Sequence, residues 1–368
     1  MIRKKLNLVQ VYESSTQMNA IAMTDFPVIG KVIDCLKMIK VPVPRPQEGE
    51  VIIKMCASAL FADELYAAQG TSLGRFFGPK MISENEPYIM GSSVSGIIVG
   101  LGKKVTNLSI GQEIISIPSQ VPVHGVWAEY CCLKQERIMQ KPEVFSFVEA
   151  AGIKMPACVS WGAITYGNIK KGDHTLVIGA SGGLGIMTVQ YLKSLCAHIT
   201  GVCSGKNVEM VYAHGADEVV DYTKNNFADI AIKNKQFYDC VFDFVGGMDA
   251  EKSGFRALKK SGKYITVTGP LMFIGENRLS WLQLGIVFFH IAFKSIIGRI
   301  YGPRYIFGEM KPSKTIFPAM SHAVEHQIKM PISQEIPFEI EAVKKALKLV
   351  LSHRAKGRIV INFSKIKF

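Results

Sequence analysis

The sequence predicts an α/β protein in which a doubly wound parallel sheet is joined to a β-rich domain. Three observations support this fold class: a glycine-rich turn between a β run and an amphipathic helix, an alternation of strands and helices after that turn, and short strands divided by proline and glycine before it. At 368 residues, of which 48% are hydrophobic and 20% charged, the chain has enough apolar sequence for two globular domains.

The glycine-rich turn covers residues 179–185 and reads GASGGLG. An apolar β run, 175–178, precedes it, and we expect a helix over about 183–196 and then a second strand over 198–204. Glycines let the backbone of such a turn approach a pyrophosphate, and the N–H groups at the helix start favour negative charge. The sequence therefore predicts a dinucleotide-binding turn. Its expected cofactor contacts are Gly179, Ser181, Gly182, Gly183, Leu184 and Gly185.

The remaining elements divide the chain into two domains. Short strands separated by turns are predicted over 18–23, 32–39, 51–55 and 91–102. A helix is expected over 145–161, and the strands of the parallel sheet are expected at 175–178, 199–203, 218–220, 240–244 and 264–267. The C-terminal part ends on a predicted strand over 358–363 and is expected to return to the first domain. We therefore expect a β-rich domain of residues 1–150 and 328–368 and a nucleotide-binding domain of residues 151–327.

The net charge of +13 limits the classes of partner. Lys and Arg are scattered, and no basic run is interleaved with aromatic residues, which argues against nucleic acid. Excess positive charge suits anionic ligands such as a phosphorylated dinucleotide, and also anionic membrane surfaces. Eight cysteines without a repeated spacing indicate reduced thiols in an intracellular protein. The basic residues 1–5 lack a following apolar segment, so we expect a cytoplasmic protein with a solvated tail, with a mitochondrial presequence as the alternative.

Six short patterns carry a resemblance to a known family. They are VPVP at 41–44, EGEV at 48–51, ASGGLG at 180–185, GADEVVDY at 215–222, VGG at 245–247 and KGRIV at 356–360. Together they resemble the zinc-free quinone oxidoreductase (zeta-crystallin-like) branch of the medium-chain dehydrogenase/reductases, over nearly the whole chain. The resemblance implies a GroES-like substrate domain, a Rossmann NADPH-binding domain, a homodimer, and hydride transfer from NADPH to a quinone or activated enone. An NADPH-binding interaction or structural protein without turnover is the alternative.

The end of the second predicted strand bears on the choice between NADH and NADPH. An Asp or Glu there would bind the ribose 2′-OH and repel a 2′-phosphate. This sequence instead has Ser204 and Lys206, with no carboxylate before Glu209. NADPH is therefore the predicted cofactor, although Lys206 is also a common solvated residue at a helix start. The resemblance implies further cofactor contacts at Ser160, Tyr222, Val245, Gly246, Thr268 and Gly269.

The substrate side is predicted from the resemblance alone. Phe61 stands where the family has an Asn near the nicotinamide, Glu64 stands for an Asp, and Tyr66 matches a Tyr that approaches the substrate. Tyr66 is the candidate proton donor or orienting group, and a packing aromatic is the alternative. No metal is expected. A catalytic zinc needs about three N, S or O ligands, whereas the family's ligand positions hold Phe61, Ser92, and Ala157 or Cys158.

Two other motifs fit different chemistry. Residues 179–183 satisfy the G-x-S-x-G pattern of serine hydrolases, with Ser181 as nucleophile and Asp243 followed by His290 or His353 in the required order. No His-Gly-Gly loop precedes Ser181, so a serine hydrolase is the less favoured alternative. Residues 322–326, HAVEH, fit H-x-x-E-H, but we expect both histidines to be ordinary helix residues.

The apolar stretch 281–300 is nearly long enough to cross a bilayer. It contains Gln283, His290 and Lys294, and a Lys near the middle of a spanning helix is costly. It also interrupts the predicted parallel sheet. We therefore expect a soluble protein in which this stretch is an apolar flap beside the nicotinamide, packing on the pocket or a partner subunit, with peripheral membrane contact when the acceptor is a lipid-tailed quinone.

Overall fold

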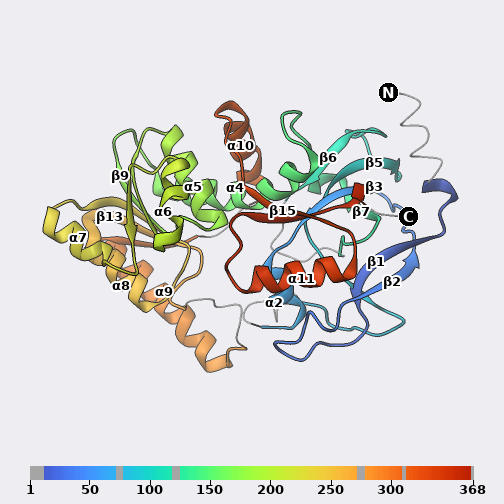
Figure 1. Ribbon diagram of the computed structural model, residues 1–368, viewed down its shortest axis with the longest axis horizontal. Helices are drawn as coiled ribbons and strands as arrows, with labels where there is room; N and C mark the ends of the chain where they lie inside the picture. Colours follow the sequence, from blue (N-terminus) through green and yellow to red (C-terminus); the bar gives the residue numbers. More distant parts are fainter. Residues whose placement is uncertain (1–11, 72–77, 118–124, 272–277, 309–311, 366–368) are drawn as a thin grey trace. The chain divides into compact units, whose positions relative to one another are not determined.

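A computed structural model describes residues 12–71, 78–117, 125–271, 278–308 and 312–365 of the chain (Figure 1). The basic residues 1–5, for which we expect a solvated tail, lie outside the described residues. The chain divides into two compact units, which we describe separately. Unit 1 comprises Met1–Lys154 and Pro331–Phe368, and unit 2 comprises Met155–Met330.

Unit 1 consists mainly of β structure and contains the segments at both ends of the chain. Its strands are β1 (Gln17–Met23), β2 (Lys37–Pro42), β3 (Glu50–Ala59), β4 (Tyr88–Ile89), β5 (Ser95–Leu101), β6 (Glu113–Ser116), β7 (Tyr130–Lys134), β8 (Ile138–Gln140), β15 (Ile332–Pro337) and β16 (Arg358–Asn362). The larger sheet has the order β15-β16-β3-β5-β6-β8, with β7 paired to β3, and the smaller sheet has the order β2-β1-β4. Helices α2 (Ala62–Ala68) and α11 (Ile340–Leu351) also belong to this unit.

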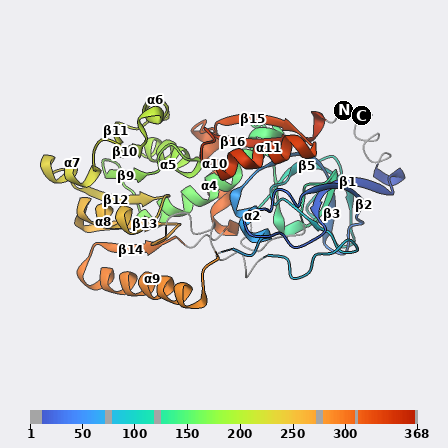
Figure 2. The same ribbon diagram turned by 60° about the horizontal axis from the view of Figure 1, so that its bottom comes forward.

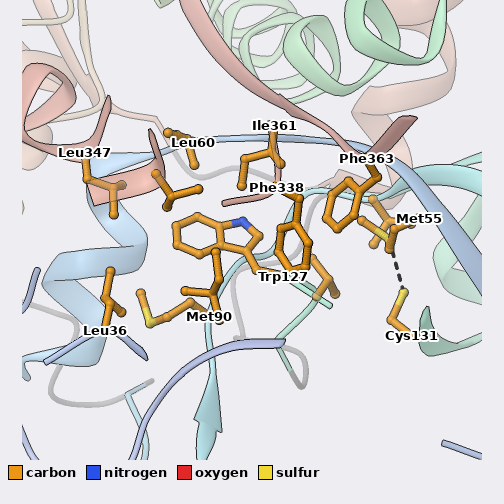
Figure 3. Close-up of a cluster of buried hydrophobic side chains, with 14 of the residues drawn as sticks. Leu36, Met55, Leu60, Met90, Trp127, Cys131, Phe338, Leu347, Ile361 and Phe363 are labelled. Atoms are coloured by element: carbon orange, nitrogen blue, oxygen red, sulfur yellow. Dashed lines mark hydrogen bonds between the residues drawn. The ribbon is translucent and has the colours of Figure 1, made fainter. Parts of the chain in front are cut away.

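Trp127 lies within the hydrophobic core of unit 1 (Figure 3). Its indole is fully buried, and Nε1 donates a hydrogen bond to Ser58 Oγ at 3.2 Å. Phe338 and Phe363 belong to the same core, and their ring centroids are 4.5 Å apart. The C-terminal segment therefore completes the core that the N-terminal strands begin.

Unit 2 is built around a six-stranded parallel sheet (Figure 2). Its strands are β9 (His174–Ile178), β10 (His198–Cys203), β11 (Glu218–Asp221), β12 (Tyr238–Asp243), β13 (Leu258–Thr266) and β14 (Arg304–Phe307). In the order β11-β10-β9-β12-β13-β14, the first and fourth strands along the chain, β9 and β12, lie side by side. In a doubly wound sheet the ligand binds at this reversal of strand order, outside the carboxyl ends of the strands.

Helices connect these parallel strands. They are α5 (Gly183–Ser194), α6 (Val208–Ala213), α7 (Phe227–Asn234), α8 (Met248–Ala257) and α9 (Trp281–Tyr301). Helix α10 (Pro312–Glu325) follows the last strand of this sheet, and α4 (Phe147–Gly167), which contains the boundary between the units, precedes the first. The fold class predicted from the sequence, a doubly wound parallel sheet with a β-rich domain, is confirmed.

One predicted strand begins too early, and one strand was not predicted. Residues 32–36 are not a strand, and the strand starts at Lys37 instead. Val32, Ile33 and Leu36 are nonetheless buried, so their apolar character reflects a loop that contributes to the core of unit 1 rather than a β pairing. The sixth strand of the parallel sheet, β14, was not predicted. It has four residues and directly follows a long apolar helix, so its short β pattern does not stand out from that helix.

Candidate functional site

The glycine-rich turn at the end of β9 is held tightly against the neighbouring strand. Gly179 has a φ of +79°, which favours glycine. The backbone N–H groups of Gly179 and Ala180 both donate to Val202 O, at 3.1 and 3.0 Å, and Gly182 N donates to Gly179 O at 3.0 Å. The chain therefore reverses at the carboxyl end of β9 and enters α5 with Gly182 as the N-cap.

Gly185 sets how closely α5 approaches this turn. A β-carbon at Gly185 would lie 2.2 Å from Gly179 O and 2.6 Å from Ala180 Cα, distances that no side chain tolerates. The N–H groups of the first helical turn have no earlier helical carbonyl to bond, so they carry positive partial charge at the carboxyl edge of the sheet. This cradle fits a pyrophosphate, as the sequence predicts for residues 179–185.

Ser160 lies beside the start of the same helix. Its side chain is fully buried on α4, and its Oγ donates to the carbonyl oxygen of Leu184 at 3.0 Å. Two predicted cofactor contacts from separate segments, Ser160 and Leu184, are thus brought together by one hydrogen bond. Gly183 occupies the first position of α5.

The turn after β10 carries the residues predicted to choose between cofactors. Ser204 follows the strand, Lys206 is exposed, and Tyr222 N donates to Cys203 O at 3.1 Å. The structure therefore brings the three predicted residues, Ser204, Lys206 and Tyr222, to one edge of the sheet. A hydroxyl, an ammonium and a phenol can hydrogen-bond a 2′-phosphate there.

Asn207 belongs to this cluster, although the sequence reasoning did not identify it. Its Nδ2 donates to Ser181 Oγ at 3.2 Å and to Ser204 Oγ at 3.3 Å. Its Oδ1 is buried and has no hydrogen-bond partner among the described residues. A buried acceptor without a partner is costly, and a ribose hydroxyl would satisfy it. Asn207 therefore links the glycine turn to the turn after β10 and fits a nucleotide.

Asp221 is a second missed residue, and it opposes the predicted preference for NADPH. Its carboxylate accepts hydrogen bonds from Thr223 N at 3.0 Å and Thr223 Oγ1 at 2.7 Å, which hold the pKa of Asp221 below its usual value. A β-carbon at Gly205 would lie 2.6 Å from Asp221 Oδ2. A permanent negative charge thus lies against the turn that carries Ser204 and Lys206. The GADEVVDY pattern contains this Asp, but only the pairing of β10 with β11 places it there.

The turns after β12 and β13 form the other half of the nucleotide edge. Asp243 Oδ1 accepts hydrogen bonds from Val245 N at 3.0 Å and Gly246 N at 2.9 Å. The two turns are joined because Gly247 N donates to Gly269 O at 3.2 Å. The amides of Thr268 and Gly269 donate to Thr266 Oγ1 at 3.2 and 3.0 Å. The predicted residues Val245, Gly246, Thr268 and Gly269 are thereby held at the carboxyl ends of neighbouring strands.

Unit 2 does not assemble a serine-hydrolase triad. Ser181 Oγ accepts a hydrogen bond from Asn207, and Asp243 Oδ2 accepts one from Tyr264 OH at 2.7 Å. His290 lies on α9, where its Nε2 is 2.9 Å from a carboxylate oxygen of Glu251. His353 belongs to unit 1. The partners of Ser181, Asp243 and His290 are therefore all different, and the hydrolase alternative finds no support.

On the substrate side, α2 of unit 1 carries the predicted residues. Phe61 is its N-cap, and the Arg358 guanidinium lies 4.8 Å from the centre of the Phe61 ring. Glu64 accepts a hydrogen bond from Ser92 Oγ at 2.6 Å, and burial raises the pKa of Glu64 to about 7. Tyr66, the candidate proton donor, is half-buried on the same helix. A phenol and a carboxyl that titrates near neutral pH are thus presented by one short helix.

Lys154 is a buried cation that the sequence reasoning missed. Its Nζ donates to Ser116 O at 3.2 Å and also to Ser116 Oγ. Burial lowers the pKa of Lys154 to about 7, against an opposing attraction from Glu64. Such shifted groups cluster at functional sites, although structural networks produce them too. The signal in the sequence is a single Lys inside the apolar stretch 145–161.

The positions at which the family places zinc do not fit a metal. In unit 1 they hold the ring of Phe61 and the hydroxyl of Ser92, which is already bonded to Glu64. In unit 2 they hold Ala157 and Cys158, and burial raises the pKa of the Cys158 thiol to about 12, which disfavours the thiolate that zinc requires. Neither unit supplies two strong ligands at these positions.

The H-x-x-E-H motif is the group of potential metal ligands found among the described residues. The ligand atoms of His322, Glu325 and His326 lie within 4.8 Å of one another. However, the His322 ring packs 4.5 Å from that of Trp161, and its Nε2 lies 2.7 Å from Ser194 Oγ. His322 thus has a packing role on α10, and His326 is exposed.

Comparisons with known proteins agree with this geometry. The family described as the alcohol dehydrogenase GroES-like domain matches residues 47–143, and the family described as zinc-binding dehydrogenase matches residues 214–361. The mitochondrial NAD(P)H oxidoreductase RTN4IP1 of Mus musculus is 29% identical over 85% of this chain and 82% of its own length. The chloroplast envelope quinone oxidoreductase homolog of Arabidopsis thaliana is 31% identical over 64% of this chain and 71% of its own length.

A solved structure confirms the fold. The quinone oxidoreductase from Coxiella burnetii superposes with a TM-score of 0.75 over 94% of this chain and 99% of its own, at 22% sequence identity.

Proposed function

Because the chain belongs to the quinone oxidoreductases of the medium-chain dehydrogenase/reductase superfamily, we propose that it transfers a hydride from NADPH to a quinone or activated enone without a metal ion. The observation that carries the proposal is the nucleotide cradle, in which Gly185 packs directly on Gly179 at the carboxyl edge of the parallel sheet. The cofactor, when bound, supplies the hydride. Quinones and enones are conjugated carbonyls, so the protein has to position the acceptor and provide a proton.

Residues of the two units have different roles in this reaction. In unit 2, the first turn of α5 and Asn207 bind the pyrophosphate and ribose, and the turns that contain Gly246 and Gly269 flank the cofactor on the other side of the strand reversal. In unit 1, Tyr66 is the candidate proton donor. Glu64, whose pKa of about 7 suits proton transfer at neutral pH, is a second candidate. Tyr66→Phe and Glu64→Gln should separate the two, because the true donor loses kcat while NADPH binding persists.

The primary test is NADPH oxidation by the purified full-length protein with a series of quinones and alkenals. Gly185→Val should abolish NADPH binding and turnover together, because its side chain would occupy the space of the Gly179 carbonyl. Gly285→Ala is the matched control, since its β-carbon meets nothing within 4 Å. Tight NADPH binding without turnover of any acceptor would instead support the interaction or structural alternative.

The proposed preference for NADPH can be tested separately. Charge-assisted contacts to a phosphate contribute roughly 1.5 to 3 kcal/mol each, so we expect NADPH to bind more than tenfold tighter than NADH. Lys206→Ala should reduce this ratio about tenfold, whereas the exposed Lys233→Ala should leave it unchanged. Asp221→Asn should increase the ratio, because a negative charge beside the phosphate is removed. Equal dissociation constants for the two cofactors in the unmodified protein would contradict the assignment.

The residues at the zinc positions support the proposal that the reaction does not depend on a metal ion. Prolonged treatment with a chelator should leave the rate of NADPH oxidation unchanged. Stoichiometric zinc that is lost together with activity would refute this part of the proposal.

Assembly and localisation complete the proposal. We expect a homodimer, which light scattering during size-exclusion chromatography would detect. The similarity to the mitochondrial RTN4IP1 supports a mitochondrial rather than a cytoplasmic location, and cell fractionation distinguishes the two.

The apolar flap expected beside the nicotinamide fits α9, because a β-carbon at Gly269 would lie 3.6 Å from Ile291 Cδ1. Peripheral membrane contact through residues 281–300 would bring this flap to lipid-tailed quinones.

A further inference from the structure

Among the described residues, α9 is the helix long and apolar enough to cross a membrane. It connects β13 to β14, which pair directly and in parallel, so the chain must return along the sheet between them. Figure 2 shows α9 at the outer edge of unit 2, alongside β14. Leu284, Val287 and Gly298 are its buried residues. The helix is therefore packed on the protein along one face, and a crossing would have to separate it from the sheet.

The charged groups near the middle of α9 point inward. Glu251 on α8 has a side chain that is 3% exposed, and it is 2.9 Å from His290 Nε2 and 3.1 Å from Lys294 Nζ. Lys294 Nζ also lies 4.6 Å from the centre of the Phe255 ring. In the sequence, His290 and Lys294 argue against a helix that spans a bilayer. In the structure, both side chains contact Glu251 on the protein side of the helix, so neither places its charge on the outer face.

That outer face is a continuous apolar stripe. Its members follow one another at intervals of three or four residues, which places them on one side of a helix. They are Leu282, Ile286, Phe289, Phe293, Ile296 and Ile300, with exposed fractions between 51% and 75%. Four exposed side chains of α9 carry hydrogen-bonding groups, and they lie near the two ends of the helix: Trp281, Gln283, Arg299 and Tyr301. An exposed stripe of this length marks an interaction surface.

The charges around the stripe identify the partner. Arg278 before the helix, Arg299 in its last turn and Arg304 after it are all exposed, and residues 278–308 contain no Asp or Glu. Trp281 and Tyr301, the aromatic residues of the two helix ends, are 69% and 68% exposed. Arginine and amphipathic aromatic groups at the margins of an apolar face suit the boundary between lipid headgroups and acyl chains. Two copies of this face would instead bring their arginines together, with no Asp or Glu from residues 278–308 between them.

We propose that α9 binds the surface of an anionic membrane, lying parallel to the bilayer with its outer stripe among the acyl chains and its arginines at the phosphates. Glu251 holds His290 and Lys294 away from the lipid and so fixes the rotation of the helix. This inference rests on the membrane contact proposed above and specifies its surface and its lipid, and its test does not use the reductase reaction.

The test uses the full-length protein and vesicles of phosphatidylcholine alone or with about a third phosphatidylglycerol. We expect the protein to cosediment with the anionic vesicles. The triple variant Phe289→Ser/Phe293→Ser/Ile296→Ser should have a partition coefficient at least tenfold lower. The matched control is Tyr212→Ser/Ile232→Ser/Phe317→Ser, three exposed apolar residues of unit 2 on other helices. Arg278→Glu/Arg299→Glu should remove the dependence on anionic lipid. Unchanged circular dichroism and thermal unfolding establish that each variant is folded.

A site-specific readout comes from Trp281. Brominated lipids should quench its fluorescence in bound protein, and Trp281→Phe should abolish that quenching, because Trp127 is fully buried in unit 1 and the half-buried Trp161 packs against Tyr191 and His322 in unit 2. Vesicle binding that is equal for the α9 variant and its control would overturn the proposal. Conversion of a dimer to a monomer by the α9 variant, with no vesicle binding by either form, would assign the face to a second copy of the chain. Retention in the membrane after alkaline carbonate extraction would indicate a spanning helix.

Discussion

Helices α4 and α9 are both 21 residues long and both largely apolar, yet they have opposite relations to solvent. Of the residues of α4, only Thr165 is exposed, whereas most residues of α9 are exposed. Each helix contains a lysine that points inward, Lys154 to Ser116 and Lys294 to Glu251. On α9 the cation marks the covered face, whereas α4 is covered on all sides. Hydropathy alone does not distinguish such helices, because the segments that pack around each helix lie elsewhere in the chain.

The largest effect is expected for Lys154, in how stability depends on pH. Its pKa is about 7 in the folded protein and near the ordinary value of 10.5 in the unfolded chain. Between these values the unfolded state binds more protons, so the free energy of unfolding should rise with pH, by roughly 3 to 6 kcal/mol over the whole window. Urea unfolding at pH 7 and pH 10 measures this rise.

Lys154→Met should lack that rise, because no ionisable group is buried at this position. The exposed Lys171→Met should keep it. Identical pH dependence in the Lys154 variant and the unmodified protein would show that the amine is not held neutral on α4.

For α9 the corresponding test removes Glu251 of α8, the carboxylate that faces His290 and Lys294. Glu251→Ala leaves His290 and Lys294 facing the protein interior without a carboxylate, and breaking a buried ion pair on one side costs roughly 3 to 5 kcal/mol. Asp249→Ala, at an exposed position of the same helix α8, should cost little. Thermal unfolding compares the two. If both variants have the same melting temperature, Glu251 does not fix the inner face of α9.

Replacing one isoleucine on each helix measures how much each helix is stabilised by the residues that surround it. Ile153 on α4 is 1% exposed, so Ile153→Ala should lower the unfolding free energy by roughly 2 to 5 kcal/mol. Ile286 on α9 is 59% exposed, and Ile286→Ala should change it by less than about 0.5 kcal/mol in the absence of membrane. A comparable loss in both variants would mean that the outer face of α9 is covered in solution.

The smallest effect distinguishes the two faces of α9. Gly285 lies in open space on the outer face, so Gly285→Ala should stabilise the helix by roughly 0.5 to 1 kcal/mol. A β-carbon at Gly298 would lie 2.6 Å from Pro303 O, so Gly298→Ala should destabilise the protein. Urea midpoints that move in the same direction for both variants would contradict the assignment of the faces.

The nucleotide turn could be predicted from sequence because all its information is local. The apolar run, the glycines and the helix start lie within residues 174–194, and the backbone contacts of Gly179 and Gly185 follow from that order. The residues that were missed depend on distant partners. Lys154 is bonded to a residue 38 positions away, and Asp221 reaches Gly205 because two parallel strands pair.

The apolar stretch 281–300 shows the same limit. Its apolar character and its length could be predicted, but His290 and Lys294 were counted only against a spanning helix, because the sequence does not show which way they point. Their partner, Glu251, is 39 residues from His290 in the chain. Glu64 is a further example, because its raised pKa depends on burial that no local pattern encodes.

The pairing of β16 with both β3 and β15 sets an order for folding during synthesis. Unit 2 is a continuous segment, so all of its strands are synthesised before β15 and β16. Unit 1 waits for the last residues of the chain, and until then β3 lacks a neighbour along residues 57–59 and the core around Trp127 lacks Phe338 and Phe363. We therefore expect the nascent chain to hold a folded nucleotide-binding unit next to an incomplete β-rich one, with the open edge of β3 as the point at which chaperones are needed.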